Sequence, residues 1–179
     1  MKKILYIKGD MFPVLEVMSE SELVVVPHVV NNVGRFGSGF AAAVTKHYPK
    51  VREDYMNWST DDVMVNRWGT KAGGRQLGNT QFVLAKQPNL VFANMCGQVG
   101  TVSAKNPKPI KYLALANAME DVAIAYTGTR FGKHFQIIAP MFGAGLACGT
   151  WKFIEELIYE IWIEVGIPVT VYHLEDIIS

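Results

Sequence analysis

The sequence has few cysteines and few charged residues, and these shortages exclude several classes of protein. Only 2 of the 179 residues are cysteine, Cys96 and Cys148, and no C-x-x-C pair is present. This argues against a disulfide scaffold and a zinc site, and we expect a cytoplasmic protein. Charged residues make up 18% of the chain, with 17 Lys and Arg against 16 Asp and Glu. So even a balance predicts neither a nucleic-acid partner nor a membrane surface.

Long uninterrupted hydrophobic segments are also lacking. The apolar run "ILYI" after Lys2 and Lys3 is too short for the core of a signal peptide. The uncharged segment 135–151 is broken by Pro140 and by glycines, so it does not predict a transmembrane helix. Half of the residues are nevertheless apolar, which is enough to build a sizeable core. We expect a soluble protein with a single domain spanning residues 1–179.

Strand and helix patterns alternate along the chain. This alternation predicts an α/β fold in which a mixed β-sheet is flanked by helices in three layers. The segment 22–31 is rich in β-branched residues, and Pro27 within it predicts a bulge or an unpaired edge nearby. Residues 59–78 are expected to be mostly loop. The expected strands are 3–10, 22–31, 80–87, 90–96, 135–140 and 168–174, and the expected helices are 38–48, 50–58, 110–126 and 150–165.

The helix predicted over 150–165 has the clearest periodicity. Its apolar residues form one stripe, and Gly166 is expected to end it. The stripe consists of Trp151, Ile154, Ile158, Ile161 and Val165.

Two glycine-rich turns each follow a predicted strand, at 34–39 and at 143–149. Ligands of such sheets bind at the carboxyl ends of strands, so we expect both turns to border one crevice. The glycines of 34–39 stand in the reverse of the dinucleotide order, and Phe40-Ala41 replace the Lys and Ser/Thr of a P-loop. Backbone N–H groups of two such turns fit a diphosphate or phospho-sugar. The alternative, that these glycines only form tight turns, stays open.

Other catalytic motifs are missing. The 4 histidines form no H-E-x-x-H motif, and Phe36 stands where a G-x-S-x-G elbow around Ser38 would need glycine. We therefore predict no metal site and no cofactor.

Five segments along the chain carry a family resemblance. They are "YIKGDMF" (6–12), "HVVNNVGRFGSGFAAAVTKHYPKVREDY" (28–55), "VFANMCGQ" (91–98), "APMFGAGLACGTW" (139–151) and "VTVYHL" (169–174). Taken in order, they resemble the macrodomain family, which binds ADP-ribose. His28, Asn31, the run Gly34–Ala41 and the "YP" at 48–49 resemble its branch of ADP-ribose 1''-phosphate phosphatases. The resemblance implies a single macrodomain over 1–179.

The resemblance also implies a ligand site. Asp10 would bind the adenine amino group, and Asn31 would hold the hydroxyls of the distal ribose. An ordinary turn at Asp10 and an Asx turn at Asn31 remain the alternatives. Asn94 would line the distal end together with Gln98. The implied ligand-binding residues are Asp10, Met11, Asn31, Gly34, Phe36, Gly37, Ser38, Gly39, Gln98, Gly143, Ala144, Gly145 and Leu146.

The implied activity is metal-independent removal of the 1''-phosphate from ADP-ribose 1''-phosphate. His28 and Asn31 would be its catalytic residues, with His28 either donating a proton or orienting the attacking water. The alternatives are an ADP-ribosyl-protein hydrolase and a binding module without turnover. Ala147 and Asn89, at positions where related branches use an acid, favour the binding module.

The expected partner is a small molecule, an ADP-ribose derivative, and we expect a monomer. RNA or poly-ADP-ribose binding is a third hypothesis, which rests on scattered basic residues that more often solvate a surface. These are Arg75, Lys105, Lys108 and Lys111.

Overall fold

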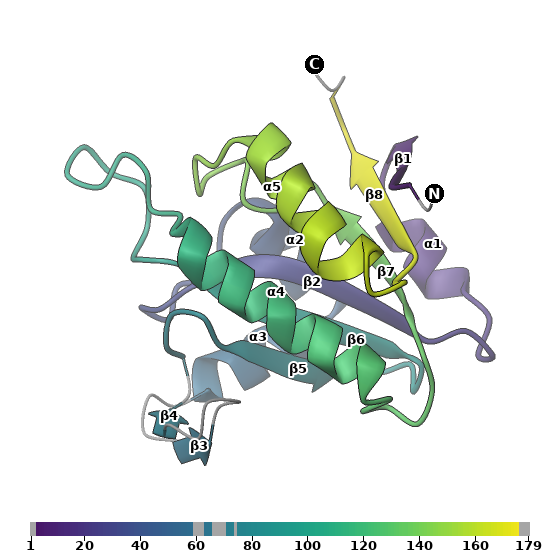
Figure 1. Ribbon diagram of the computed structural model, residues 1–179. Helices are drawn as coiled ribbons and strands as arrows, with labels where there is room; N and C mark the ends of the chain where they lie inside the picture. The colour runs from purple at the N-terminus through teal and green to yellow at the C-terminus, as the bar shows by residue number, and fades with distance from the viewer. Residues whose placement is uncertain (1–2, 59–62, 66–70, 74, 176–179) are drawn as a thin grey trace.

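A six-stranded mixed β-sheet runs through the centre of the protein (Figure 1). The computed structural model describes residues 3–58, 63–65, 71–73 and 75–175. Neighbouring strands are parallel except at one edge, where β5 is antiparallel to β6. The strands lie in the order β1 (Leu5–Lys8), β8 (Val169–His173), β7 (Gln136–Pro140), β2 (Val24–Asn31), β6 (Leu90–Gln98) and β5 (Thr80–Leu84). The prediction of a mixed sheet is confirmed.

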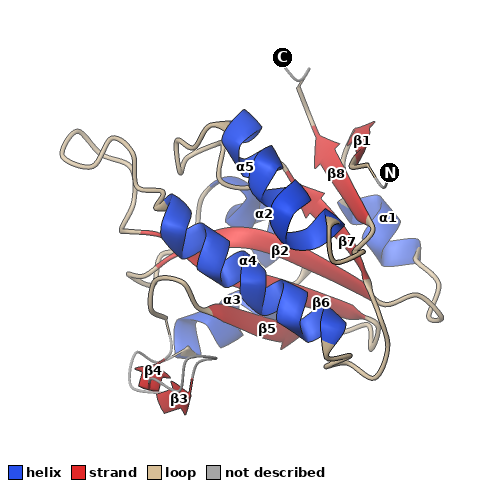
Figure 2. Cartoon of the chain, viewed as in Figure 1, coloured by secondary structure: helices blue, strands red, loops and turns tan. Residues whose placement is uncertain are grey.

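Helices cover both faces of this sheet (Figure 2). One face packs against α4 (Tyr112–Thr127) and α5 (Trp151–Ile158). The other packs against α1 (Phe12–Val17), α2 (Gly39–His47) and α3 (Pro49–Asn57). Successive strand residues point to opposite faces, so Val25 joins the first core while Val24 and Val26 join the second. The three-layer arrangement is confirmed, whereas α1 was not predicted.

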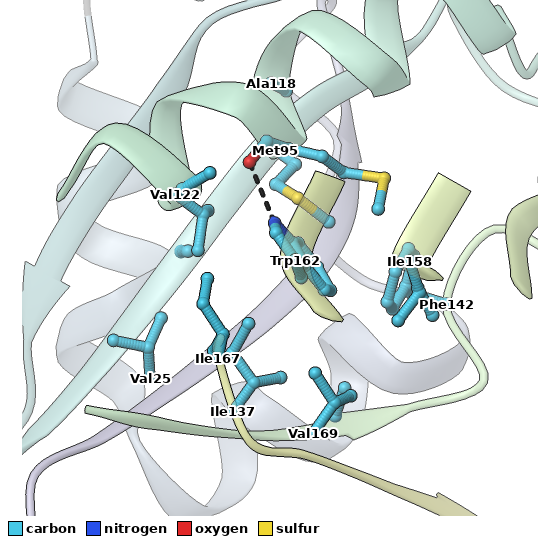
Figure 3. Packing of buried hydrophobic residues seen from close by; sticks show 14 of the residues in the cluster. Val25, Met95, Ala118, Val122, Ile137, Phe142, Ile158, Trp162, Ile167 and Val169 are labelled. Atoms are coloured by element: carbon cyan, nitrogen blue, oxygen red, sulfur yellow. Dashed lines mark hydrogen bonds between the residues drawn. The ribbon is translucent and has the colours of Figure 1, made fainter. Parts of the chain in front are cut away.

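The core beside α4 and α5 is built around Trp162, which is fully buried (Figure 3). Its indole N–H donates a hydrogen bond to the Met119 carbonyl oxygen at 2.8 Å. Because a buried indole N–H needs an acceptor, this bond ties the segment after α5 to α4.

The helix predicted over 150–165 is not α-helical throughout. It changes at Tyr159 into a π-helical turn, η1 (Tyr159–Ile163). The extra residue in that turn rotates the buried stripe, so Trp162 and Ile163 are buried while Val165 is 42% exposed. The predicted stripe is therefore wrong at Val165. Gly166, with φ of 96°, follows the last turn as predicted.

The segment 59–78, predicted to be mostly loop, contains two short strands. These strands, β3 (Val63–Val65) and β4 (Lys71–Gly73), pair antiparallel and form a separate two-stranded sheet. The prediction is wrong for these residues. Residues 59–62, 66–70 and 74 of this segment lie outside the described residues, so the loop prediction is not tested there.

Strand β2 loses one neighbour before Pro27. Its ladder with β7 joins only Val24 and Val25, and its register with β6 shifts between Val30 and Asn31. These two irregularities confirm the bulge or open edge predicted from Pro27. The physical reason is that a proline has no N–H to donate to a strand ladder. Of the helices in the described ranges, none has the length and hydropathy to cross a bilayer.

Candidate functional site

A cavity of about 700 Å³ opens where β2, β6 and β7 end. It lies between the two glycine-rich loops, as predicted from their positions after strands. The loop that follows β6 contributes a third wall. The lining residues are 28–31, 35–41, 98, 101–102, 140–143 and 145–147.

The Asn31 side chain shapes the first loop. Its Oδ1 accepts hydrogen bonds from the N–H groups of Val33 and Arg35, both at 3.1 Å. Its Nδ2 donates to the Arg35 carbonyl oxygen at 2.6 Å. The alternative interpretation of Asn31 as an Asx turn therefore describes its bonding, and most of its polar capacity is used within the loop.

Tyr55 on α3 also stabilises this turn, through its hydroxyl group. Its hydroxyl lies 2.6 Å from the Asn31 carbonyl oxygen and 3.0 Å from Oδ1. Burial raises the pKa of Tyr55 to about 12, so the hydroxyl stays protonated and can donate its hydrogen. The start of the loop is thus held by a helix that is distant in sequence.

The second loop closes on itself through main-chain hydrogen bonds. The N–H of Gly149 donates to the Gly143 oxygen at 2.8 Å, and that of Cys148 donates to the Gly145 oxygen at 2.8 Å. Across the part of the chain that the structure describes, the N–H groups of 37–38 and 143–147 meet no acceptor. Unpaired N–H groups from two loops bordering one cavity favour an anionic ligand.

The charges of the cavity point the same way. Arg35 lines it, whereas no Asp or Glu contributes to the wall within the described residues. An anion therefore meets a cation and no carboxylate. As for metals, no three His, Cys, Asp or Glu side chains gather at a possible ion site anywhere in the described ranges.

His28 is the other titratable residue of the wall, and it is 2% exposed. Its Nε2 lies 2.6 Å from Oδ1 of Asn94, the residue paired with it on β6. Its ring makes edge contacts with Phe36 and Phe40, with centroids 5.5 Å away in each case. Burial lowers the pKa of His28 to about 4, only partly opposed by the Asn94 hydrogen bond, so the imidazole is neutral at physiological pH.

Most of the residues predicted for the site line this cavity. They are His28, Asn31, Phe36, Gly37, Ser38, Gly39, Gln98, Gly143, Gly145 and Leu146. Asn94, expected to line the distal end, instead lies behind His28 and is fully buried. It reaches the cavity only through the histidine.

Four predicted residues do not line the cavity. Asp10 is at the same edge of the sheet, but its Oδ1 accepts the N–H of Phe12 at 3.0 Å, as in an ordinary turn. Met11 is buried and packs in the core on the face of the sheet that α1, α2 and α3 cover. Gly34 packs against Arg75, and Ala144 is also absent from the lining. At these four positions, ligand contact stays a prediction.

Residues of the wall that the sequence analysis did not name include the charged Arg35 and, from the loop after β6, Thr101 and Val102. Arg35 stands inside the glycine pattern, and residues 101–102 follow a strand end, so both had a usable signal. Asn89 occupies a position where a related branch uses an acid. It lies at the amino end of β6, whereas the cavity opens at the carboxyl end. The Asn89 Nδ2 donates to the Ser19 and Glu22 carbonyl oxygens, each at 2.7 Å.

Solved structures similar to this chain cover nearly its full length. A macrodomain protein from Streptomyces coelicolor is 33% identical, with a TM-score of 0.69 over 95% of this chain and 98% of that one. A protein of unknown function from Bacteroides thetaiotaomicron is 31% identical, with a TM-score of 0.76 over 97% and 99%. DarTG from Thermosipho africanus, in complex with ADP-ribose, is 17% identical with a TM-score of 0.69 over 98% and 43%, which shows the fold alone. No protein-family model and no curated protein matches the sequence.

Proposed function

The chain belongs to the macrodomain family, and on that premise we propose that it binds ADP-ribose or an ADP-ribose derivative in the cavity between the two glycine loops. The observation that carries the proposal is the pair of loops whose unpaired N–H groups border a wall without carboxylates in the described residues. ADP-ribose is an anion with a central diphosphate, which such a wall would hold. The Thermosipho africanus neighbour is itself in complex with ADP-ribose.

The dimensions and dipoles of the site support the same ligand. A volume of about 700 Å³ lies within the usual range for small-molecule sites. Helix α2 begins at Gly39, which lines the cavity. The positive end of the helix dipole therefore lies at the cavity wall and favours a phosphate there. Arg35 adds a full positive charge at the same loop.

Glycine-to-alanine variants test this proposal. A Cβ on Gly37 or Gly145 would meet no protein atom within 4 Å, so the fold should tolerate Gly37→Ala and Gly145→Ala. Both residues line the cavity, where the added methyl group would occupy ligand space. We expect each variant to keep its melting temperature but to bind ADP-ribose at least about tenfold more weakly by calorimetry.

The wild type provides the reference. Ligand at about 100 times Kd adds roughly 2.7 kcal/mol of stability, which corresponds to an increase in Tm of roughly 5–10 °C for a domain of this size. ADP-ribose should raise Tm clearly more than AMP does. If saturating ADP-ribose produces no increase, the protein does not bind it and the proposal is wrong.

Hydrolysis of ADP-ribose 1''-phosphate is the second candidate function, and the position of His28 in the wall favours it. A water oxygen would attack the phosphorus, the bond between phosphorus and the 1''-oxygen would break, and ADP-ribose and phosphate would leave. A neutral imidazole can accept a hydrogen from the attacking water. The ADP-ribosyl-protein hydrolase alternative would need an acid from elsewhere, because Ala147 stands where the related branch has one.

Phosphate release tests the second candidate. Release from ADP-ribose 1''-phosphate should continue in EDTA and should fall by about 100-fold or more in His28→Ala. Ser21→Ala, an exposed change outside the cavity wall, should release phosphate at the wild-type rate. A wild-type protein that binds ADP-ribose but releases no phosphate would be a binding module.

A further inference from the structure

A chain of buried and half-buried hydrogen bonds extends from His28 through two side-chain amides to a main-chain oxygen. His28 Nε2 lies 2.6 Å from Asn94 Oδ1, and Asn94 Nδ2 donates to Gln81 Oε1 at 2.9 Å. Gln81 Nε2 then donates to the main-chain oxygen of Asp54 at 2.9 Å. The four residues lie on β2, β6, β5 and α3, so only the folded chain brings them together.

The last acceptor determines the direction of every bond in this chain. A main-chain carbonyl oxygen can only accept, so the amide of Gln81 must point its NH₂ group at Asp54. Its Oε1 then faces Asn94 and requires the NH₂ group of that residue. Asn94 therefore turns Oδ1 toward His28, and His28 Nε2 must carry the hydrogen.

Burial keeps water from replacing the hydrogen bond between His28 and Asn94. Asn94 is fully buried and His28 is 2% exposed. The Nε2–H is engaged by Asn94, and no described residue gives Nδ1 a hydrogen-bond partner. With the imidazole neutral, Nδ1 carries a lone pair and no hydrogen.

We propose that Asn94 and Gln81 are positioning residues that hold His28 in the Nε2–H tautomer, so that it offers the cavity a lone pair at Nδ1 and no proton. What that lone pair does rests on the proposed hydrolysis: it accepts a hydrogen from the attacking water. The proton required by the leaving 1''-oxygen comes from solvent or from the phosphate itself. The sequence leaves two roles open for His28, proton donation and orientation of the attacking water. The hydrogen-bond chain favours the second role, because Nδ1 then carries no proton to donate.

The tautomer can be measured without any ligand. Long-range ¹H–¹⁵N NMR spectra distinguish the protonated from the unprotonated ring nitrogen of each neutral histidine. The His28 signals are assigned by their loss in His28→Gln. We expect Nε2 to be protonated from pH 5.5 to 8. Protonation at Nδ1 in the wild type would overturn the proposal.

Two changes at Gln81, which does not line the cavity, test the positioning role. Gln81→Leu removes the acceptor of the Asn94 NH₂ group and frees that amide to rotate. We expect an Nδ1–H signal to appear and kcat for phosphate release to fall about tenfold or more, with KM changed less than about twofold. Gln81→Glu gives up the donor to the Asp54 oxygen but keeps the acceptor that faces Asn94, so it should retain the Nε2–H tautomer. Leu84→Ala, an exposed change on the same strand, is the matched control.

These measurements separate the positioning role from the proposed function. If Nε2 is protonated in the wild type but no phosphate is released, the positioning holds and only the hydrolysis is wrong. If Gln81→Leu folds and leaves the tautomer unchanged, Gln81 does not position His28 and the proposal fails. Should that variant not fold, the wild-type tautomer and the Gln81→Glu spectrum still decide the outcome.

Discussion

Gly149 provides a direct test of how the second loop is built. Its N–H donates to the Gly143 oxygen at 2.8 Å, and a Cβ on Gly149 would lie 2.5 Å from that same oxygen. The Cβ would also lie 2.9 Å from Ile110 Cδ1 and 3.1 Å from Ile154 Cδ1. Because the nearest atom belongs to the main chain, Gly149→Ala requires the loop itself to move.

The cost has two parts. Losing the loop-closing hydrogen bond costs about 1 kcal/mol, and overpacking against the two isoleucines costs about 1–3 kcal/mol. The free energy of unfolding should therefore fall by about 2–4 kcal/mol. For a domain of this size, each 1 kcal/mol corresponds to about 2–4 °C, so Tm should fall by roughly 5–15 °C.

Differential scanning calorimetry of Gly149→Ala and Gly145→Ala checks this reasoning. Gly145 lies in the same loop, but its Cβ would meet no protein atom within 4 Å. Gly145→Ala should therefore melt within about 2 °C of the wild type. A Gly149→Ala variant that also melts within about 2 °C would show that the loop closure does not constrain this position as the structure indicates.

Three further changes should have the following effects. Tyr55→Phe leaves the Asn31 carbonyl oxygen without its hydroxyl donor, so the free energy of unfolding measured in urea should fall by about 1–2 kcal/mol. Calorimetry should also show weaker ADP-ribose binding. If neither value changes, Tyr55 does not support the loop. Burial holds the pKa of His28 at about 4 in the folded state, below the usual 6.5, so the unfolded chain takes up the proton first as the pH falls. Stability should therefore drop by about 3 kcal/mol between pH 6.5 and 4, and urea unfolding of His28→Gln should lack this part of the drop; identical pH profiles would contradict the assigned burial. Trp162→Phe removes the hydrogen bond to the Met119 oxygen and leaves space in the core, so Tm should fall in line with a loss of about 1–3 kcal/mol, and an unchanged Tm would contradict that packing.

Much of the fold follows from local sequence patterns. The β-branched run before Asn31 predicts the central strand β2, and the two glycine turns after strands predict loops at one edge of the sheet. Such patterns depend on neighbours within one element, which a sequence displays directly. The π-helical turn at Tyr159 was not predictable in this way, because the apolar spacing along 150–165 fits a regular α-helix.

The candidate site was less predictable than the fold. Asp10 follows a strand as expected, yet only the folded chain shows that it bonds to Phe12 and does not line the cavity. Asn31 reaches the wall, but its amide is engaged by its own loop and by Tyr55. Both outcomes depend on side-chain competition for hydrogen bonds, which spacing along the chain does not reveal.

The sequence by itself determined the α/β class, the alternation of strands and helices, and the glycine loops that border the cavity. It also placed His28 on a strand next to those loops. Only the tertiary structure decided what His28 can do, because its partners Asn94 and Gln81 come from β6 and β5. Strand register, set by the packing of two cores against one sheet, aligns these amides with the histidine and leaves Nδ1 without a partner among the described residues.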